Sequence, residues 1–258
     1  MLHVLYEDDN IIVVWKPVGM ESQSSRGFGA DMVSEIRRYI HNLSTSLSTK
    51  SGGTYVGVIH RLDKPVSGVM VYAKEKKSAA VLSKQVAEGK MEKRYLAVLC
   101  GKPVDNVENY VDYLLKDEKE NVSRIVDMRI TGAKRAELIC KALKTRQVEP
   151  YGSLTLAEIE LKTGRHHQIR VQMAGHGLPI WGDNRYNPEF GGTCGSVQEA
   201  GSKASGQESE NRRKSRAAAV RADVALAAYQ LTFAHPVSGK SMTFQQFPEG
   251  KIFQNFNN

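Results

Sequence analysis

Hydrophobic and polar positions alternate along much of the chain, and this spacing predicts β-strands. Two short apolar runs, residues 4–6 and 11–15, flank the turn signal Asp8-Asp9-Asn10 and predict a hairpin. Two more apolar runs, residues 56–59 and 69–73, lie on either side of a polar loop. Further strands are predicted at residues 95–99, 113–115, 136–143, 153–161, 226–233 and 242–247.

Three stretches show the period of a helix instead. In the first, Asp31 is a suitable N-cap, and the apolar residues share one helical face: Met32, Val33, Ile36, Ile40 and Leu43. Residues 77–88 fit a second helix that ends at Gly89, and residues 168–174 a third that closes at Gly175. Many strands in hairpin order with few helices predict an α+β fold with a mixed, mostly antiparallel sheet.

The length of 258 residues suits one large domain or two small ones, and we expect a single catalytic domain over residues 1–258. Residues 191–222 stand apart because they are rich in Gly, Ser, Ala, Glu and basic residues and nearly free of large apolar ones. This composition predicts a disordered or mobile insertion. Its basic cluster at residues 212–216 is either a contact for RNA phosphates or part of a solvated linker.

The composition supports a real core, since 41% of the residues are hydrophobic. The formal net charge of +8 and the sequence pI near 9.3 favour a polyanionic partner. The alternative is a basic protein with no role in nucleic-acid binding. Charge alone does not decide between the two.

The three cysteines, Cys100, Cys140 and Cys194, are odd in number and widely spaced, which indicates a reducing compartment and no disulfide framework. No CxxC pair is present, so a cysteine zinc site is not expected. Acidic residues interrupt the first nine positions, unlike a signal peptide. No apolar run approaches the roughly 20 residues of a membrane span, and we expect a cytoplasmic protein without a membrane partner.

The stretch from His60 to Gly68 places one carboxylate, Asp63, between Arg61 and Lys64. These cations favour the charged form of Asp63, which is then available as a nucleophile or base. The alternative is a surface ion pair or a turn residue.

A second polar stretch, residues 161–171, contains Thr163-Gly164-Arg165 followed by His166-His167. The two histidines resemble a metal pair, but adjacent side chains of a helix point in different directions and no third ligand is suitably spaced. We therefore expect no metal here.

Six blocks of this sequence occur in an order typical of one family. They are Lys16-Pro17-Val18-Gly19, the Asp63 block, Lys93-Arg94-Tyr95-Leu96-Ala97, the Arg165 block, Gly177 to Tyr186, and Leu231-Thr232-Phe233-Ala234-His235-Pro236. With these blocks, from about residue 4 to residue 247, the chain resembles the RluA-type family of RNA pseudouridine synthases. Many members carry an added N-terminal S4 RNA-binding domain, for which we expect no counterpart here.

The resemblance implies a pseudouridine synthase fold, with a long bent sheet flanked by helices and a central catalytic cleft. It also implies an RNA pseudouridine synthase, an isomerase that needs no cofactor. Asp63 would be the essential carboxylate, either attacking the sugar or removing the C2′ proton. Arg165 would orient that carboxylate bidentately, although phosphate binding alone is the alternative. Tyr95 would be the surface on which the flipped uracil stacks, although strand pattern alone favours a core tyrosine.

The resemblance further implies that Arg61 fills the gap left by the flipped nucleotide, with a structural ion pair as the alternative. His60 and Lys64 are candidates for flanking phosphates, and Lys16, Lys93 and Arg170 are weaker ones. Three departures from the family pattern, Pro65-Val66, His166 and Gln172, leave the catalytic residues unaffected but put in doubt which RNA is recognised.

The expected partner is RNA, a tRNA or ribosomal RNA stem-loop selected by shape, and we expect a monomer with no obligate protein partner. A catalytically silent RNA-binding protein on the same fold is the alternative function. A nucleoside hydrolase or glycosidase is a further one, but nothing near Asp63 supplies the second carboxylate that glycosidases use.

Overall fold

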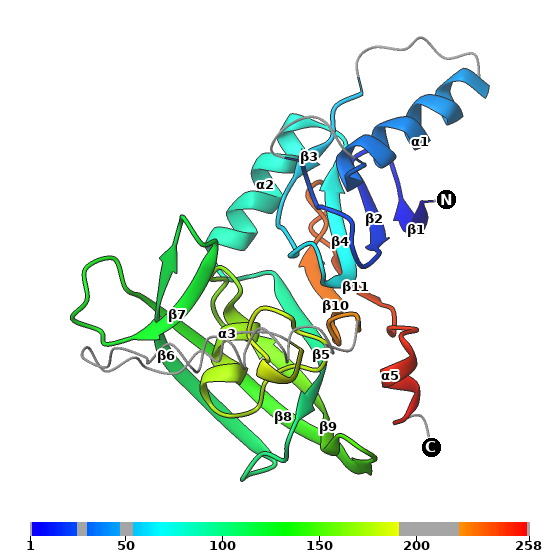
Figure 1. Ribbon diagram of the computed structural model, residues 1–258. Helices are drawn as coiled ribbons and strands as arrows, with labels where there is room; N and C mark the ends of the chain where they lie inside the picture. The colour runs from blue at the N-terminus through cyan, green and yellow to red at the C-terminus, as the bar shows by residue number, and fades with distance from the viewer. Residues whose placement is uncertain (1, 25–29, 47–53, 191–221, 257–258) are drawn as a thin grey trace. The chain divides into compact units, whose positions relative to one another are not determined.

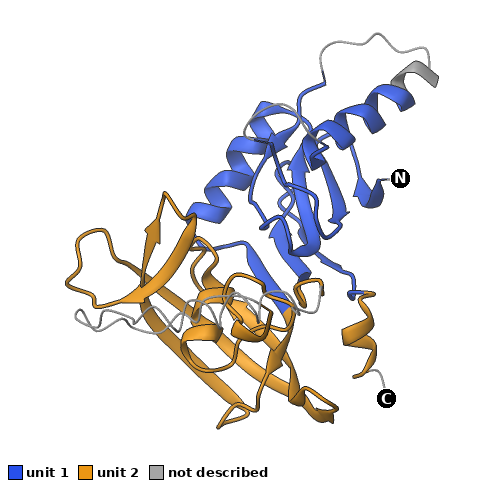
Figure 2. Ribbon diagram, viewed as in Figure 1, with its two compact units in different colours: residues 1–95, 227–248 blue, residues 96–226, 249–258 orange. Residues whose placement is uncertain are grey.

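A computed structural model describes residues 2–24, 30–46, 54–190 and 222–256 (Figure 1). The predicted insertion at residues 191–222 falls almost wholly outside these residues. The chain divides into two compact units, which Figure 2 colours separately. Unit 1 comprises residues 1–95 and 227–248, and unit 2 comprises residues 96–226 and 249–258. The expectation of a single catalytic domain stays a prediction beside this division into two units.

Unit 1 is built on a sheet in which β1 (His3–Glu7), β2 (Ile11–Lys16), β4 (Ser67–Ala73) and β10 (Leu226–Ala234) follow one another. β1 and β2 form the predicted antiparallel hairpin, and β2 pairs antiparallel with β4. β10 runs parallel to β4 and antiparallel to β11 (Ser241–Gln245). The short β3 (Gly57–Val58) also pairs with β4, so the segment that carries Asp63 connects two neighbouring strands.

Both faces of the central strands are buried, which explains their nearly unbroken apolar sequences. On one face, residues of β2, β4 and β10 pack with Leu82 of helix α2 (Lys76–Ala87), which Figure 1 shows beside the sheet. Helix α1 (Met32–Ser46) buries Met32, Val33 and Ile36. The Asp31 carboxylate accepts a hydrogen bond of 2.7 Å from the Ser34 amide and so caps α1 as predicted.

Gly68, in the Ser-Gly pair of the Asp63 block, lies where a larger residue would clash with β10. Its φ is +148°, and a Cβ at this position would lie 2.5 Å from the Ala228 Cβ and 2.6 Å from the Ala228 backbone. Since β4 and β10 pair in parallel here, only glycine lets their backbones approach so closely.

Unit 2 contains sheet strands in the order β5, β9, β8, β6, β7, of which β9, β8, β6 and β7 pair antiparallel. The bounds are β5 (Glu92–Cys100), β6 (Val107–Asp117), β7 (Val122–Val126), β8 (Lys134–Val148) and β9 (Gly152–Leu161). Helix α3 (Gln168–Gly175) packs Val171 and Ala174 against Leu114 and Ala136 of this sheet. The unit boundary falls within β5, directly after Tyr95.

Most predicted elements are confirmed, but several were missed or had different bounds. β7 was not predicted, because its five residues carry Ser123 and Arg124 among the apolar ones. β6 extends well beyond the predicted residues 113–115. Helix α3 is closed by Gly177, whose φ is +75°, and Gly175 is instead its last residue. The short η1 (Pro188–Phe190) and α5 (Lys251–Gln254) were also not predicted. Among the described helices, none combines the length and apolar character needed to cross a bilayer.

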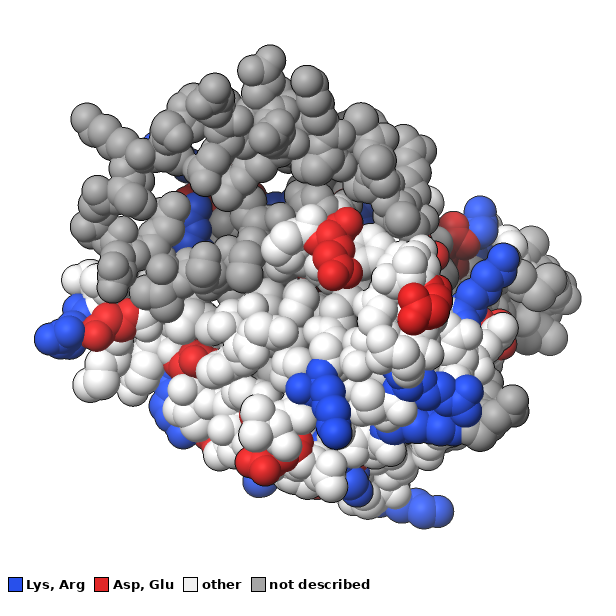
Figure 3. All heavy atoms as spheres, turned by 60° about the horizontal axis from the view of Figure 1, so that its bottom comes forward, with Lys and Arg blue, Asp and Glu red and all other residues white. Residues whose placement is uncertain are grey.

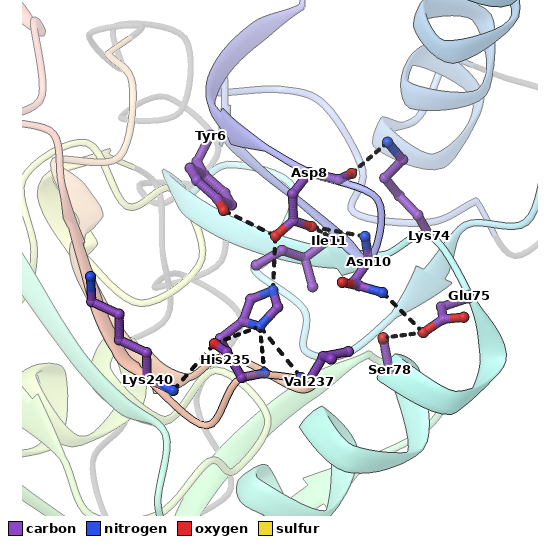
Figure 4. A network of polar contacts seen from close by, with 11 residues as sticks. Tyr6, Asp8, Asn10, Ile11, Lys74, Glu75, Ser78, His235, Val237 and Lys240 are labelled. Atoms are coloured by element: carbon purple, nitrogen blue, oxygen red, sulfur yellow. Dashed lines mark hydrogen bonds and ion pairs between the residues drawn. The ribbon is translucent and has the colours of Figure 1, made fainter.

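The hairpin turn of β1 and β2 is joined to the end of β10 by a carboxylate network (Figure 4). The Asp8 Oδ1 atom accepts hydrogen bonds of 2.8 Å from the amides of Asn10 and Ile11. Its Oδ2 atom accepts hydrogen bonds from the Tyr6 hydroxyl (3.0 Å) and the His235 Nε2 (2.8 Å). Burial raises the pKa of Asp8, but these hydrogen bonds together lower the pKa below its usual value.

We expect Asp8→Asn to lower the free energy of unfolding by about 2 kcal/mol at pH 7, because the new amide would face the donors Tyr6 and His235. Since the pKa of Asp8 is lowered by folding, its contribution is present above the unfolded value near 3.9 and is lost as the pH falls through the folded value. Urea unfolding at pH 7 and at pH 3 measures the difference. The exposed neighbour variant Asp9→Asn is the control. If the difference in free energy of unfolding between wild type and Asp8→Asn is as large at pH 3 as at pH 7, this account is contradicted.

Candidate functional site

Asp63 lies in the irregular segment between β3 and β4, in unit 1. Its side chain is partly buried, while those of Arg61 and Lys64 are exposed. The Val66 amide donates a hydrogen bond of 3.0 Å to the Asp63 carbonyl and closes a turn before β4 begins. The segment therefore carries the Asp63 carboxylate on a backbone whose two ends are fixed by β3 and β4.

Lys16 lies beneath this segment, with no exposed surface. Its ammonium donates hydrogen bonds to three carbonyls, those of Pro17 (3.0 Å), Met20 (2.6 Å) and Lys64 (3.2 Å). Burial lowers the pKa of Lys16 to about 8, against an opposing attraction from Asp63. All three ammonium hydrogens are used inside the protein, which argues against the predicted phosphate contact. Lys16 instead fixes the backbone next to Asp63.

Tyr95 lies in the part of β5 that belongs to unit 1, with 6% of its surface exposed. Burial raises the pKa of Tyr95 well above its usual value, and the negative charge of Asp63 raises it further. The phenol is therefore a neutral group within electrostatic reach of the carboxylate. Asp63 and Tyr95, which come from two separate sequence blocks, thus belong to the same unit, and their catalytic roles stay predictions.

His60 does not fit its predicted contact with a phosphate. It is 8% exposed, and its Nε2 accepts a hydrogen bond of 3.3 Å from the Val71 amide. Burial lowers the pKa of His60 to about 3, with a further contribution from Lys93, so the ring is neutral. A buried neutral imidazole cannot serve as a cationic phosphate contact, and His60 instead accepts a hydrogen bond from β4.

Lys93 lies two residues before Tyr95 on the same strand, so both side chains point to the same side of the sheet. It is only partly exposed, and burial lowers its pKa. Arg61 is exposed, and exposed Lys64 lies 3.5 Å from a carboxylate oxygen of Glu21. The contacts of Arg61, Lys64 and Lys93 with RNA stay predictions.

Arg165 lies in unit 2, in the loop before α3, and its side chain is exposed. Its Nε donates a hydrogen bond of 2.8 Å to the Arg135 carbonyl, and its amide donates one of 2.9 Å to the Oε1 of Gln168. The same Oε1 accepts a hydrogen bond of 2.8 Å from the Thr163 hydroxyl. This arrangement explains why threonine and glutamine flank the arginine in this block. The catalytic role of Arg165 stays a prediction.

Arg170 was predicted to contact a phosphate, and its position argues against this. It is 3% exposed and donates from Nε and Nη2 to the two carboxylate oxygens of Asp183, at 2.7 and 2.8 Å. Its guanidinium also lies 5.3 Å from the centre of the Tyr186 ring. A buried bidentate ion pair of this kind joins α3 to the Gly177–Tyr186 block and is structural.

The adjacent His166 and His167 take part in hydrogen bonds within unit 2. The His166 Nδ1 lies 2.9 Å from the Ser123 hydroxyl, and the His167 Nδ1 lies 2.8 Å from the Tyr186 hydroxyl. Burial lowers the pKa of His167 to about 2, followed by the effect of nearby cations such as Arg170. Over the residues that the structure describes, no three His, Cys, Asp or Glu side chains gather as metal ligands would.

Comparisons with known proteins identify one family. A family model described as RNA pseudouridylate synthase matches residues 10–175. Ribosomal large subunit pseudouridine synthase C of Rickettsia bellii is 33% identical over 71% of this chain and 56% of its own length. The enzyme of the same name from Escherichia coli is 34% identical over 71% of this chain and 52% of its own length. Ribosomal large subunit pseudouridine synthase D of Zymomonas mobilis is 28% identical over 94% of this chain and 68% of its own length.

The chain thus spans between about half and two thirds of the length of these relatives. Among solved structures, human RNA Pseudouridylate Synthase Domain Containing 4 aligns with a TM-score of 0.68. It covers 96% of this chain and 89% of its own chain at 21% identity, a likeness that concerns the fold alone. The predicted fold class is confirmed by this likeness and by the mixed, mostly antiparallel pairing.

Proposed function

Because the chain belongs to the RNA pseudouridylate synthase family, we propose that it converts uridines of a structured RNA into pseudouridine. The observation that carries the proposal is that Asp63 and the buried phenol of Tyr95 belong to the same unit, with the carboxylate charge adding to the effect of burial in raising the pKa of Tyr95. The reaction breaks the bond between N1 of uracil and C1′ of the ribose and joins C5 to C1′. The proton on C5 leaves and N1 gains one, so atoms and electrons balance without a cofactor.

In this proposal Asp63 supplies the negative charge near C1′ and C2′ of the target nucleotide, as nucleophile or as base. Tyr95 supplies the ring against which the detached uracil turns, and its hydroxyl handles a proton at the edge of the base. For Arg165 we propose the role of orienting the carboxylate, supported by the fit of a guanidinium to a carboxylate and by its exposed position.

The target uridine must leave its stack to reach Asp63, at a cost of a few kcal/mol. Exposed Arg61 and Lys64, on either side of Asp63, are the groups that we propose to hold the opened RNA. The net charge of +8 favours binding of a polyanion, and basic side chains gather toward the right of the face seen in Figure 3. Since the three named relatives are ribosomal large subunit pseudouridine synthases, we propose the RNA of that subunit as the first substrate to test.

The test is incubation of the purified protein with transcripts of large-subunit ribosomal RNA and of tRNA, followed by carbodiimide treatment and primer extension. We expect new stops at discrete uridines of the ribosomal transcript. Stops in the tRNA transcript instead would support the proposed activity but show that tRNA, not ribosomal RNA, is the substrate. Release of free uracil would indicate a hydrolase, and binding without stops in either RNA would favour a silent RNA-binding protein.

A further inference from the structure

The Ser22 hydroxyl contacts the residue just before Asp63 twice and also lies 3.6 Å from the Sδ atom of Met70. Its hydroxyl donates a hydrogen bond of 2.9 Å to the Leu62 carbonyl and accepts one of 3.0 Å from the Leu62 amide. A hydroxyl is one of the few side-chain groups that can donate and accept at once. Ser22 thereby satisfies both polar groups of one peptide residue, as a neighbouring strand would do in a sheet.

Ser22 is itself held firmly. It is 4% exposed, and its carbonyl accepts a hydrogen bond of 3.1 Å from the hydroxyl of Tyr72, which has no exposed surface and belongs to β4. The position of the Ser22 hydroxyl is therefore set by a core strand. A buried serine fixed in this way transmits the rigidity of the sheet to the irregular segment that follows β3.

The residue after Asp63 is held by the same stretch of chain. The Lys64 carbonyl accepts hydrogen bonds from the Gly19 amide (2.9 Å) and from the Lys16 ammonium (3.2 Å). Consecutive Cα atoms are about 3.8 Å apart across a trans peptide, so anchoring both neighbours leaves the Asp63 backbone little freedom. Residues 16–22 therefore hold the backbone on both sides of the carboxylate, and Ser22 holds the N-terminal side.

We propose that Ser22 is a positioning residue for Asp63, acting through the peptide groups of Leu62. The inference rests on the proposed function, because it assigns Ser22 to the reaction of that site. A misplacement of about 1 Å at a reacting group can lower a rate roughly 100-fold, so a loosened loop affects the chemical step more than RNA binding. Ser22 touches neither the carboxylate nor, in this proposal, the RNA.

The test compares Ser22→Ala and Ser22→Cys with the wild type in single-turnover assays of pseudouridine formation, with KM and the Kd for RNA measured in parallel. We expect Ser22→Ala to lower the rate constant roughly 10- to 100-fold while KM and Kd stay within about twofold. The thiol in Ser22→Cys is close in size to the hydroxyl and is a weak donor and acceptor. We therefore expect the rate constant of Ser22→Cys to lie between those of Ser22→Ala and the wild type.

The matched control is Ser78→Ala in the first turn of α2. Ser78 is 1% exposed and donates a hydrogen bond of 2.8 Å to Glu75, so its replacement removes the hydroxyl of another buried serine of the same unit away from Asp63. We expect this variant to keep the wild-type rate constant. An equal loss of rate in Ser78→Ala, an unchanged rate in Ser22→Ala, or a loss that appears only in KM would each overturn the proposal.

Amide hydrogen exchange separates this inference from the proposed function, because it needs no RNA. Ser22→Ala is expected to speed exchange of the Leu62 amide by a factor on the order of ten or more, and Ser78→Ala is not. Unchanged exchange at Leu62 would overturn the positioning role even if the enzyme is active. The wild type could instead form no pseudouridine while Ser22→Ala still speeds exchange of the Leu62 amide. That result would overturn the proposed function and the catalytic part of this inference, and only the restraint of the loop by Ser22 would remain.

Discussion

Replacement of Asp63 by asparagine is expected to lower the rate of pseudouridine formation by a factor on the order of 10⁴, with RNA binding unchanged within about threefold. Asparagine keeps the size of the side chain and an acceptor oxygen but removes the negative charge on which both possible routes depend. Since Leu62 and Lys64 are held through their backbones, the loop itself is expected to stay in place. Single-turnover kinetics and filter binding on the same transcript measure the two quantities.

The control for this prediction is Asp9→Asn, which removes one negative charge from an exposed turn of the same unit. Its rate is expected to match the wild type, so a loss confined to Asp63→Asn cannot result from net charge alone. A variant Asp63→Asn that keeps a tenth or more of the wild-type rate would remove Asp63 from the chemistry. If Asp63→Asn binds RNA more weakly but reacts at the wild-type rate with saturating RNA, Asp63 is a binding residue instead.

Sequence patterns predicted the parts of the molecule that depend on local periodicity and on motifs. The β1–β2 hairpin, the capped helix α1 and the buried strand β4 follow directly from apolar spacing and turn residues. The resemblance to the RluA-type family, drawn from six ordered blocks, is confirmed by the family model over residues 10–175. Short strands with polar residues, such as β7, were missed because their burial depends on partners distant in the chain.

The environment of each basic residue could not be predicted from the sequence. Arg61 and Lys64 are exposed, whereas Lys16 and Arg170 are buried, and the residue types alone do not distinguish the two pairs. A lysine that bonds three carbonyls and an arginine that bonds an aspartate are products of the fold, not of local sequence. Ser22 was missed for the same reason, since a serine in a polar loop suggests a solvated turn.

Replacement of Tyr95 by phenylalanine is expected to lower the rate constant of pseudouridine formation about 100-fold, with KM changed by no more than about threefold. The ring and its stacking surface remain, so the loss measures the hydroxyl alone. Because burial and Asp63 raise the pKa of Tyr95, the phenol stays protonated at physiological pH. The wild-type rate should therefore show no change from the ionisation of Tyr95 below about pH 10.

Tyr6→Phe is the matched control, because it removes a hydroxyl bonded to Asp8 in the same unit and away from Asp63. It is expected to lower stability slightly and to leave the rate constant unchanged. If Tyr95→Phe reacts at the wild-type rate while Tyr95→Ala does not, Tyr95 contributes its ring alone, and the proton at C5 must leave through another group. If Tyr95→Phe loses rate and its remaining rate also rises with pH where the wild-type rate does not, removal of the C5 proton in the variant passes to a different titrating base.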